Sequence, residues 1–299
     1  MRNNYDLVVI GGGPAGLTAG IFTCRAGLNT ILLEGKFVGG QASISYEISN
    51  YPGFENISGM DLSEKMFNHA SNLGLNFCYE TVVKLTKNKT YFSIKTSAQL
   101  IKAKKVIIAC GSVVKKLELE NEKKLTGKGI SYCASCDGGF FKNKIVAVVG
   151  GGNSAVEYVN YLSRISKKIY LIVRKDCLKA GKQEEEKIKK LKNVKILFNS
   201  QISKIKGDEV LSGVTIKTKE GNKNLALDGL FVAIGYKPEL SFLKIEVEKD
   251  QAGYIKVDEN QKTSVENLYA CGDIVSKNFK QVITACADGA RAGNSCIGE

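Results

Sequence analysis

Cys133 and Cys136 form a Cys-Ala-Ser-Cys motif, and their spacing narrows the chemistry that this chain can perform. Such a pair either supplies two of the four ligands of a structural zinc ion or exchanges disulfides with a second molecule. The chain has no second Cys-x-x-Cys pair and one histidine, His69, so zinc is disfavoured and we predict no metal site. A buried structural pair is also disfavoured, because glycine and polar residues surround the motif. We therefore interpret the pair as a redox-active dithiol.

Thiol–disulfide exchange requires a group that moves a proton between the attacking and the leaving thiol. His69 is remote in sequence and is expected on a helix that begins near Asp61, where an ordinary structural role is the simpler interpretation. Asp137 directly follows Cys136. A carboxyl group close to thiols can have a raised pKa, and we predict Asp137 as the general acid.

Two glycine-rich turns lie on either side of the dithiol. Each follows an apolar run of strand length and precedes a predicted helix, a context in which backbone N–H groups and the helix N-terminus bind a dinucleotide pyrophosphate. A tight turn without a ligand is the alternative interpretation of the first one. A shift of 139 residues superimposes them, which indicates an internal duplication. The turns are Gly11-Gly12-Gly13-Pro14-Ala15-Gly16 and Gly150-Gly151-Gly152-Asn153-Ser154-Ala155.

The residue at the end of the second strand distinguishes the two nucleotides. Glu34 stands 23 residues after Gly11, where a carboxylate can hold both ribose hydroxyls. The same shift places Val173 opposite Glu34, and the basic residues Arg174, Lys175 and Lys179 follow. This pattern is expected where the ribose carries a 2′-phosphate. The first site should hold an adenine dinucleotide with free ribose hydroxyls and the second should prefer NADPH, unless the basic residues are only surface charges.

The wider pattern predicts the elements that position these residues. Residues 6–34 read as strand, helix and strand, and residues 144–175 repeat that layout. Smaller β insertions are expected near residues 80–108 and 195–234. The tail from residue 268 has no counterpart in the second half and should return to complete the first domain. The predicted fold class is α/β, with two Rossmann-like nucleotide-binding domains, the second inserted into the first; their predicted bounds are 1–114 with 243–299, and 115–242 for the domain that carries the dithiol.

Composition excludes several other classes of protein. No apolar run approaches the roughly 18 residues of a membrane helix, and no signal peptide precedes the first strand, so we expect a cytoplasmic protein. Nine cysteines in 299 residues, most of them scattered singly, do not suit a secreted disulfide scaffold. The net charge of +13 either attracts an acidic partner or reflects a solvated lysine-rich surface. The lysines are dispersed without interleaved aromatic residues, so nucleic-acid binding is not expected.

These motifs together identify a family. Almost end to end, the chain resembles the low-molecular-weight thioredoxin reductases of prokaryotes. The resemblance includes both glycine-rich turns and the dithiol with Asp137-Gly138. Its other motifs are Gly39-Gly40-Gln41, Tyr51-Pro52-Gly53, Arg174-Lys175-Asp176, Ile234-Gly235-Tyr236-Lys237-Pro238, Tyr269-Ala270-Cys271-Gly272-Asp273-Ile274 and Gln281-Val282-Ile283-Thr284-Ala285.

The resemblance implies FAD in the first domain, NADPH in the second, a homodimer, and a thioredoxin as partner. It also implies that the NADPH domain swings relative to the FAD domain, and that Cys136 is the sulfur nearer the flavin. Asp273 would bond the ribityl chain, and residues 281–283 would face the pyrimidine edge. The implied FAD residues are Gly11, Gly13, Pro14, Ala15, Gly16, Glu34, Gly40, Gln41, Asn50, Val83, Gly111, Gly272, Asp273, Gln281, Val282 and Ile283. The implied NADPH residues are Gly150, Gly152, Asn153, Ser154, Arg174, Lys175, Lys179, Ile234 and Gly235.

The chain departs from the family pattern in one place that matters. The basic segment reads Val173-Arg174-Lys175, where the family usually has a histidine followed by arginines. Lysine lacks the planar fork of arginine, so the preference for NADPH over NADH is expected to be weaker.

Three other functions compete with an NADPH-dependent thioredoxin-disulfide reductase. The same flavoprotein core serves a peroxidase system, but that version usually carries an extra N-terminal redox domain. Relatives that reduce ferredoxin lack the dithiol, so Cys133 and Cys136 argue against them. A redox sensor that binds flavin without turnover is the third, and no added interaction module supports it.

Overall fold

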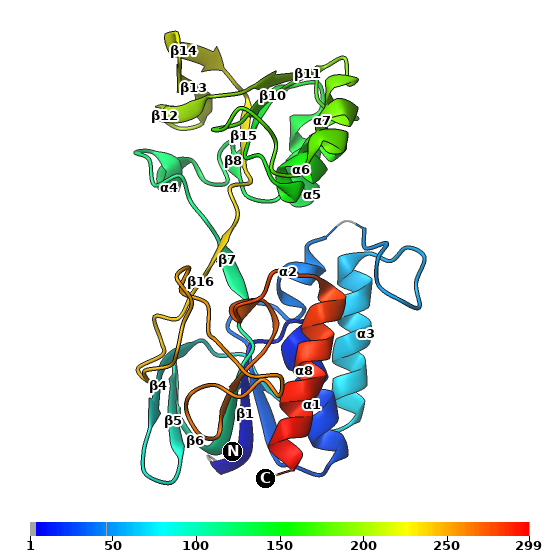
Figure 1. Ribbon diagram of the computed structural model, residues 1–299, viewed down its shortest axis with the longest axis vertical. Coiled ribbons are helices and arrows are strands. Elements are labelled where there is room, and N and C mark those ends of the chain that lie inside the picture. The colour runs from blue at the N-terminus through cyan, green and yellow to red at the C-terminus, as the bar shows by residue number, and fades with distance from the viewer. Residues whose placement is uncertain (1–3, 46, 299) are drawn as a thin grey trace. The chain divides into compact units, whose positions relative to one another are not determined.

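The computed structural model describes residues 4–45 and 47–298, and the chain divides into two compact units. Unit 1 comprises Met1–Val113 and Lys237–Glu299, and unit 2 comprises Val114–Tyr236 (Figure 1). The first division lies within one residue of the boundary expected from the sequence. The second lies earlier, because residues 237–242 belong with unit 1: the Phe242 carbonyl accepts a hydrogen bond from Leu85 N–H and its ring joins the unit 1 core. Residues 1–3, 46 and 299 of the predicted first domain lie outside the described residues.

A seven-stranded sheet forms the centre of unit 1, in the order β3-β2-β1-β6-β5-β4 with β17 also paired to β6. The strands β1, β2, β3, β6 and β17 are parallel, and β4 and β5 add an antiparallel edge. Pairing of β17 with β6 brings the tail back into the first unit. The bounds are β1 Asn4–Ile10, β2 Thr30–Leu33, β3 Asn76–Cys78, β4 Val82–Lys87, β5 Phe92–Thr96, β6 Leu100–Ile108 and β17 Leu268–Ala270.

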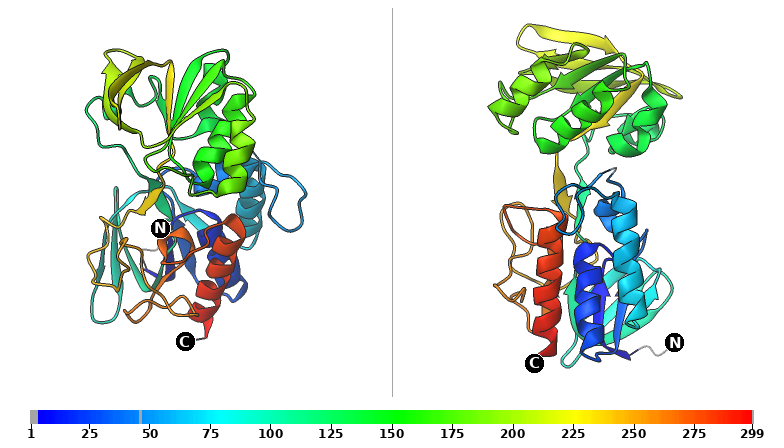
Figure 2. Two further views of the ribbon diagram at one scale, coloured as in Figure 1. Left: turned by 45° about the horizontal axis from the view of Figure 1, so that its top comes forward. Right: turned by 90° about the vertical axis from the view of Figure 1, so that its right-hand side faces the viewer.

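Helices cover one face of this sheet. The right-hand view of Figure 2 shows α1 (Pro14–Arg25) between α8 (Val282–Ile297) and α3 (Gly59–Asn72). Alternate residues of β1 serve the two faces: Leu7 and Val9 pack with the helices, and Val8 and Ile10 pack in the core on the other face. The contact of α8 with α1 is close, because a Cβ at Gly289 would collide with the carbonyl oxygen of Ala15. The packing of these helices thereby fixes the end of α1 that follows the first glycine-rich turn.

Unit 2 repeats this plan around a five-stranded parallel sheet of order β11-β10-β9-β15-β8. An antiparallel sheet of β12, β13 and β14 is the β insertion, and β7 pairs with β16 where the chain passes between the units. The strands are β7 Ser112–Val114, β8 Ile130–Ser131, β9 Ile145–Val149, β10 Lys168–Ile172, β11 Val194–Leu197, β12 Gln201–Gly207, β13 Leu211–Thr218, β14 Gly221–Ala226, β15 Gly229–Val232 and β16 Tyr236–Pro238. The remaining helices are α2 Gly40–Ser43, α4 Glu122–Leu125, α5 Ala134–Asp137, α6 Asn153–Ser163, α7 Lys182–Lys189 and the 3₁₀ turns η1 Gly138–Phe141 and η2 Gly272–Ile274.

Candidate active site

The two cysteines of the motif form a disulfide at the start of α5. Cys133 is the N-cap of this short helix, and its Cα lies 5.4 Å from that of Cys136. The backbone N–H of Cys136 donates to the Cys133 sulfur at 3.2 Å, and the Ser135 hydroxyl lies 3.3 Å from the same sulfur. Cys136 is exposed, whereas Cys133 is half-buried. The other seven cysteines form no disulfide among the described residues.

Asp137 is linked to the dithiol through Ser131. The Ser131 hydroxyl donates to Asp137 Oδ2 at 2.6 Å and accepts the backbone N–H of Cys133 at 3.0 Å. This hydroxyl therefore fixes the predicted acid relative to the first cysteine. In the sequence Ser131 is one of several polar residues around the motif, and nothing in the pattern distinguishes a connecting hydroxyl from a solvated one.

A buried carboxylate holds the strand that leads into the dithiol. Glu122 accepts the Tyr132 hydroxyl at 2.7 Å and also the backbone N–H groups of Leu117 and Glu118. The Tyr158 hydroxyl donates to the Tyr132 carbonyl at 2.6 Å, so both ends of Tyr132 are held. Burial, and then the hydrogen bond to Glu122, raise the pKa of the Tyr132 phenol well above its ordinary value. Sequence reasoning missed Glu122, which lies in a run of charged residues that looks exposed.

The first glycine-rich turn is enclosed on one side and open on the other. Gly11 has a positive φ, and a Cβ there would lie 2.5 Å from the Ala109 carbonyl oxygen. A Cβ at Gly16 would collide with the Gly11 carbonyl oxygen. At Gly13, the N-cap of α1, a Cβ would meet nothing within 4 Å, and no side chain caps the helix. The open N-terminus of α1, with Pro14 at its start, thus leaves backbone N–H groups for an anionic ligand.

Glu34 closes this turn from the end of β2. Its Oε2 accepts the backbone N–H of Gly12 at 2.8 Å, and its Oε1 accepts that of Lys36 at 2.9 Å. Each carboxylate oxygen retains a lone pair that can accept a ribose hydroxyl. The structure therefore places the predicted acid beside the turn, as the 23-residue spacing led us to expect.

Further predicted residues converge on the same turn. A Cβ at Gly40 would lie 3.4 Å from Gly13 Cα, and one at Gly272 would lie 2.8 Å from Ala15 Cβ. Gly111 has a positive φ and follows Ala109 and Cys110, whose backbone atoms lie against Gly11. Gln41, in α2, is exposed. Val83 is 46% exposed in β4, and no described contact brings it to the turn.

Asn50, Asp273 and the start of α8 form a second part of this site. The Asn50 amide donates to Gln281 Oε1 at 3.2 Å, although the residues are 231 positions apart. Gln281 and Thr284 form a capping box that spans Val282 and Ile283. Asp273 Oδ1 is buried and accepts no hydrogen bond from a described residue. Burial raises the pKa of Asp273 above its ordinary value, and this effect is opposed by Lys277 and Lys280.

These features fit FAD. The open glycine-rich turn suits a pyrophosphate, Glu34 suits a ribose, and the Asp273 side chain, which is 37% exposed, can accept a ribityl hydroxyl on its open side. Unit 1 therefore contains acceptor atoms and an open helix N-terminus of the kind that such a dinucleotide requires.

The second glycine-rich turn has the same backbone plan. A Cβ at Gly150 would collide with the Ala233 carbonyl oxygen, whereas one at Gly152, the uncapped N-cap of α6, would meet nothing within 4 Å. Asn153 and Ser154 begin α6, and Ile234 and Gly235 follow β15 beside the turn. The open helix N-terminus therefore fits the pyrophosphate of a second dinucleotide.

Basic residues follow β10 beside this turn. Val173 is buried, and its Cγ1 would lie 3.1 Å from a Cβ at Gly151. The backbone N–H of Lys179 donates to the Gly151 carbonyl at 2.7 Å, so the basic loop returns to the turn. Arg174 and Lys175 are exposed. This set of residues fits a nucleotide whose ribose carries a phosphate.

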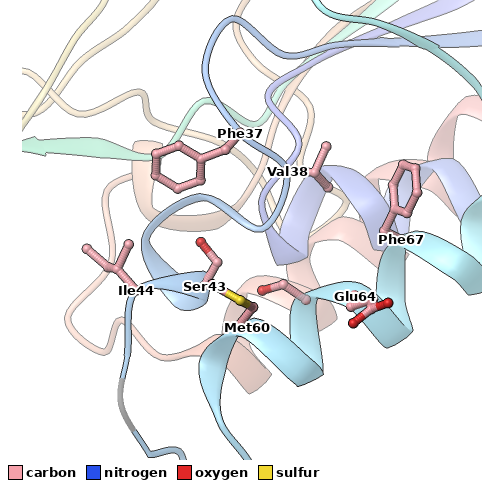
Figure 3. A pocket seen from close by; sticks show the side chains of 8 residues that line it. Phe37, Val38, Ser43, Ile44, Met60, Glu64 and Phe67 are labelled. Atoms are coloured by element: carbon pink, nitrogen blue, oxygen red, sulfur yellow. The ribbon is translucent and has the colours of Figure 1, made fainter. Parts of the chain in front are cut away.

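Two other features bear on the site. An apolar cavity of about 480 Å³ lies in unit 1, and Figure 3 shows the side chains of Phe37, Ile44 and Phe67 around it. None of the predicted cofactor residues lines it.

Within residues 4–45 and 47–298, no group of three or more His, Cys, Asp or Glu side chains is arranged to hold a metal ion. None of the helices in the same residues combines the length and apolar character that a membrane span requires.

Comparisons with known proteins agree with this geometry. Residues 5–289 match the family model described as pyridine nucleotide-disulphide oxidoreductase. A thioredoxin reductase of Borreliella burgdorferi is 43% identical, with 95% of this chain and 88% of that protein covered. A thioredoxin reductase of Peptoclostridium acidaminophilum is 42% identical, with 98% and 96% covered. The crystal structure of Lactococcus lactis thioredoxin reductase (FR conformation) is 37% identical with a TM-score of 0.91, covering 98% of this chain and 97% of that one. The chain therefore belongs to the pyridine nucleotide-disulphide oxidoreductase family and, within it, to the low-molecular-weight thioredoxin reductases.

Proposed function

We propose that this protein is an NADPH-dependent thioredoxin-disulfide reductase. In the overall reaction NADPH, a proton and the disulfide of a thioredoxin yield NADP⁺ and the thioredoxin dithiol. The observation that carries the proposal is the Cys133–Cys136 disulfide in a chain that also contains two open dinucleotide turns. A disulfide, unlike a metal site, both accepts two electrons and passes them to another disulfide by exchange.

FAD would occupy unit 1 and NADPH unit 2. Gly13 and the N-terminus of α1 would receive the FAD pyrophosphate, Glu34 its ribose and Asp273 its ribityl chain. When bound, FAD carries two electrons from NADPH to the disulfide. In unit 2 the N-terminus of α6 would hold the NADPH pyrophosphate, and Arg174 with Lys175 would face its 2′-phosphate.

The dithiol would complete the reaction by exchange. After reduction, the thiolate of one cysteine attacks the partner disulfide and forms a mixed disulfide, while one partner sulfur leaves as a thiolate and takes a proton. The second cysteine then attacks the mixed disulfide, re-forms the Cys133–Cys136 bond and releases the partner dithiol. The exposure of Cys136 and the fixed position of Asp137 beside Cys133 support both steps.

A spectroscopic titration tests the whole proposal. Purified protein should be yellow, lose its visible absorbance with NADPH, and recover it when oxidised thioredoxin is added. Replacing both cysteines by serine should lower thioredoxin reduction by about 10³-fold or more and leave the NADPH-driven bleaching intact. The matched control, C24S, removes a cysteine that forms no disulfide and should keep full turnover. Colourless protein that takes up no FAD, or turnover without Cys133 and Cys136, contradicts the proposal.

Asp137 is the proposed acid for the leaving thiol. Asp137→Asn keeps the hydrogen bond from Ser131 within reach but removes the carboxyl proton. We expect the dithiol step to slow by about 10²-fold, with flavin reduction by NADPH unchanged, in stopped-flow absorbance measurements. D208N, an exposed carboxylate in the same unit, serves as the control. A D137N enzyme with an unchanged dithiol step would exclude Asp137 from the mechanism.

We also infer that the protein forms a homodimer in a reducing cytoplasm. The exposed apolar side chains of Phe37 and Met60 beside the cavity of unit 1 support a protein contact there. The seven cysteines outside the motif support a reducing compartment, because none forms a disulfide among the described residues. Sedimentation equilibrium of the purified holoenzyme measures the first inference directly.

A further inference from the structure

Lys277 forms the most enclosed ion pair of the described residues. Its ammonium lies 2.6 Å from Asp288 Oδ2 and 3.7 Å from Asp273 Oδ1. The side chains of Lys277 and Asp288 are 16% and 10% exposed, whereas the lysine is at least 47% exposed in the other ion pairs of described residues. A buried ion pair is costly to break, because removal of one partner leaves an uncompensated charge.

The two carboxylates belong to different elements, both of which are proposed to contact FAD. Asp273 lies in η2, and Asp288 lies in α8. The ammonium also lies 3.5 Å from the hydroxyl of Thr284, which caps the start of α8 through Gln281. Lys277, in the connecting segment 275–281, thus links η2, which is proposed to bind the ribityl chain, to the start of α8.

Asp273 itself is held from two sides. Lys280 donates to its backbone carbonyl at 2.9 Å, and the Lys280 ammonium lies 3.2 Å from the centre of the Tyr254 ring. Lys277 faces Oδ1, the buried oxygen that has no hydrogen-bond donor among the described residues, while the side chain as a whole is 37% exposed. The carboxylate therefore has one enclosed side that faces a positive charge and one side open to a ligand.

We propose that Lys277 is a positioning residue for FAD, which holds the carboxylate of Asp273 and the start of α8 in the arrangement that receives the flavin. This inference rests on the proposed FAD site of unit 1. Lys277 acts through Asp273 and, by way of Asp288, through α8. Preorganisation of two binding elements by one ion pair lowers the entropy that the ligand must overcome when it binds.

The test is titration of apoprotein with FAD, monitored by quenching of flavin fluorescence. K277M should weaken FAD binding by about tenfold, since it removes a charge–charge contact from a buried site. K277R retains the charge and should bind within about threefold of the wild type. The control K104M removes a lysine from the exposed Lys104–Asp6 pair of the same unit and should bind FAD normally. Each titration is made below the thermal transition of its variant, so that a loss of folded protein does not count as weak binding.

A double-mutant cycle separates positioning from general stability. D273N should weaken FAD binding, and in this background K277M should cause a clearly smaller further loss, of about threefold, because only the link through Asp288 to α8 remains to be removed. An unchanged affinity in K277M, or an equal loss from K277M with and without Asp273, would overturn the proposal. If K277M does not fold, D288N takes its place, with an expected loss of about threefold that also depends on Asp273. A wild-type apoprotein that binds no FAD would instead refute the proposed function.

Discussion

The two glycine-rich turns share a backbone plan but differ in the side chain that contacts the middle glycine. In unit 1, Glu34 accepts the N–H of Gly12; in unit 2, Val173 packs against Gly151. The next loop returns in both: Gly39 N–H donates to the Gly12 carbonyl at 2.8 Å, and Lys179 N–H donates to the Gly151 carbonyl at 2.7 Å. Backbone hydrogen bonds and glycines thus fix the turn, and we propose that the one side chain after the second strand selects the nucleotide.

The third small residue shows how far the duplication has diverged. Gly16 in unit 1 leaves no room for a Cβ, whereas Ala155 occupies the corresponding position in unit 2. The helix that follows the first turn therefore lies closer to the preceding backbone. A methyl group at this position would collide with that backbone in unit 1, whereas unit 2 accommodates the methyl group of Ala155.

A reciprocal pair of substitutions gives the largest expected effect. G16A should destabilise unit 1 by about 3 kcal/mol or more and abolish FAD retention, because the added Cβ collides with the Gly11 carbonyl. A155G should cost only about 1 kcal/mol, the ordinary penalty for glycine in a helix. Urea unfolding and the flavin content of purified protein measure both. A G16A protein with a full complement of FAD would show that the turns do not differ in this way.

A change of the side chain that contacts the middle glycine of the second turn should have an intermediate effect, which falls on the KM for the nucleotide. V173E places a carboxylate opposite Gly151, as Glu34 stands opposite Gly12, and should raise KM for NADPH by about tenfold or more while lowering KM for NADH. R174Q should raise KM for NADPH alone, since it removes only a contact with the 2′-phosphate. Steady-state kinetics with both nucleotides measure the ratio. Equal changes for NADPH and NADH in R174Q would mean that Arg174 is only a surface charge.

The smallest expected effect concerns a carboxylate of unit 1 that has no counterpart in unit 2. Burial raises the pKa of Asp273 above its ordinary value of 3.8, so the folded apoprotein binds this proton more tightly than the unfolded chain. Stability therefore falls as pH rises through the raised pKa. D273N should increase the Tm of apoprotein at pH 7 and flatten its dependence on pH above 4, while weakening FAD binding. A lower Tm for D273N apoprotein than for wild-type apoprotein at pH 7 would contradict the predicted direction of the change.

Local patterns in the sequence predicted much of the fold. The strand–turn–helix units around Gly11 and Gly150 follow from apolar runs and glycines, which are local signals. The second boundary between the units lies earlier than expected, because the contact of Phe242 with Leu85 joins segments that are far apart in the sequence. Helix α8 continues past Gly293 to Ile297, since Gly293 marks a close helix contact instead of a helix end.

Polar contacts between distant segments could not be predicted in the same way. Glu122 looks like one of several exposed charges, but Tyr132 and two backbone N–H groups bury it. Lys277 looks like another surface lysine until Asp288 is placed beside it. Asn50 and Gln281 were brought together only by resemblance to a family, because no periodicity relates residues 231 positions apart.

The return of β17 and α8 to unit 1 has a consequence for how the chain matures during translation. The ribosome releases all of residues 114–236 before it makes the last strand and helix of the first unit. Unit 2 can thus complete its own sheet early, whereas the first unit must wait, with β6 lacking a neighbour and α1 lacking its packing partner. Completion of the first unit is therefore a terminal event of synthesis, and a nascent chain stalled before Leu268 would contain a finished second unit and an incomplete first one.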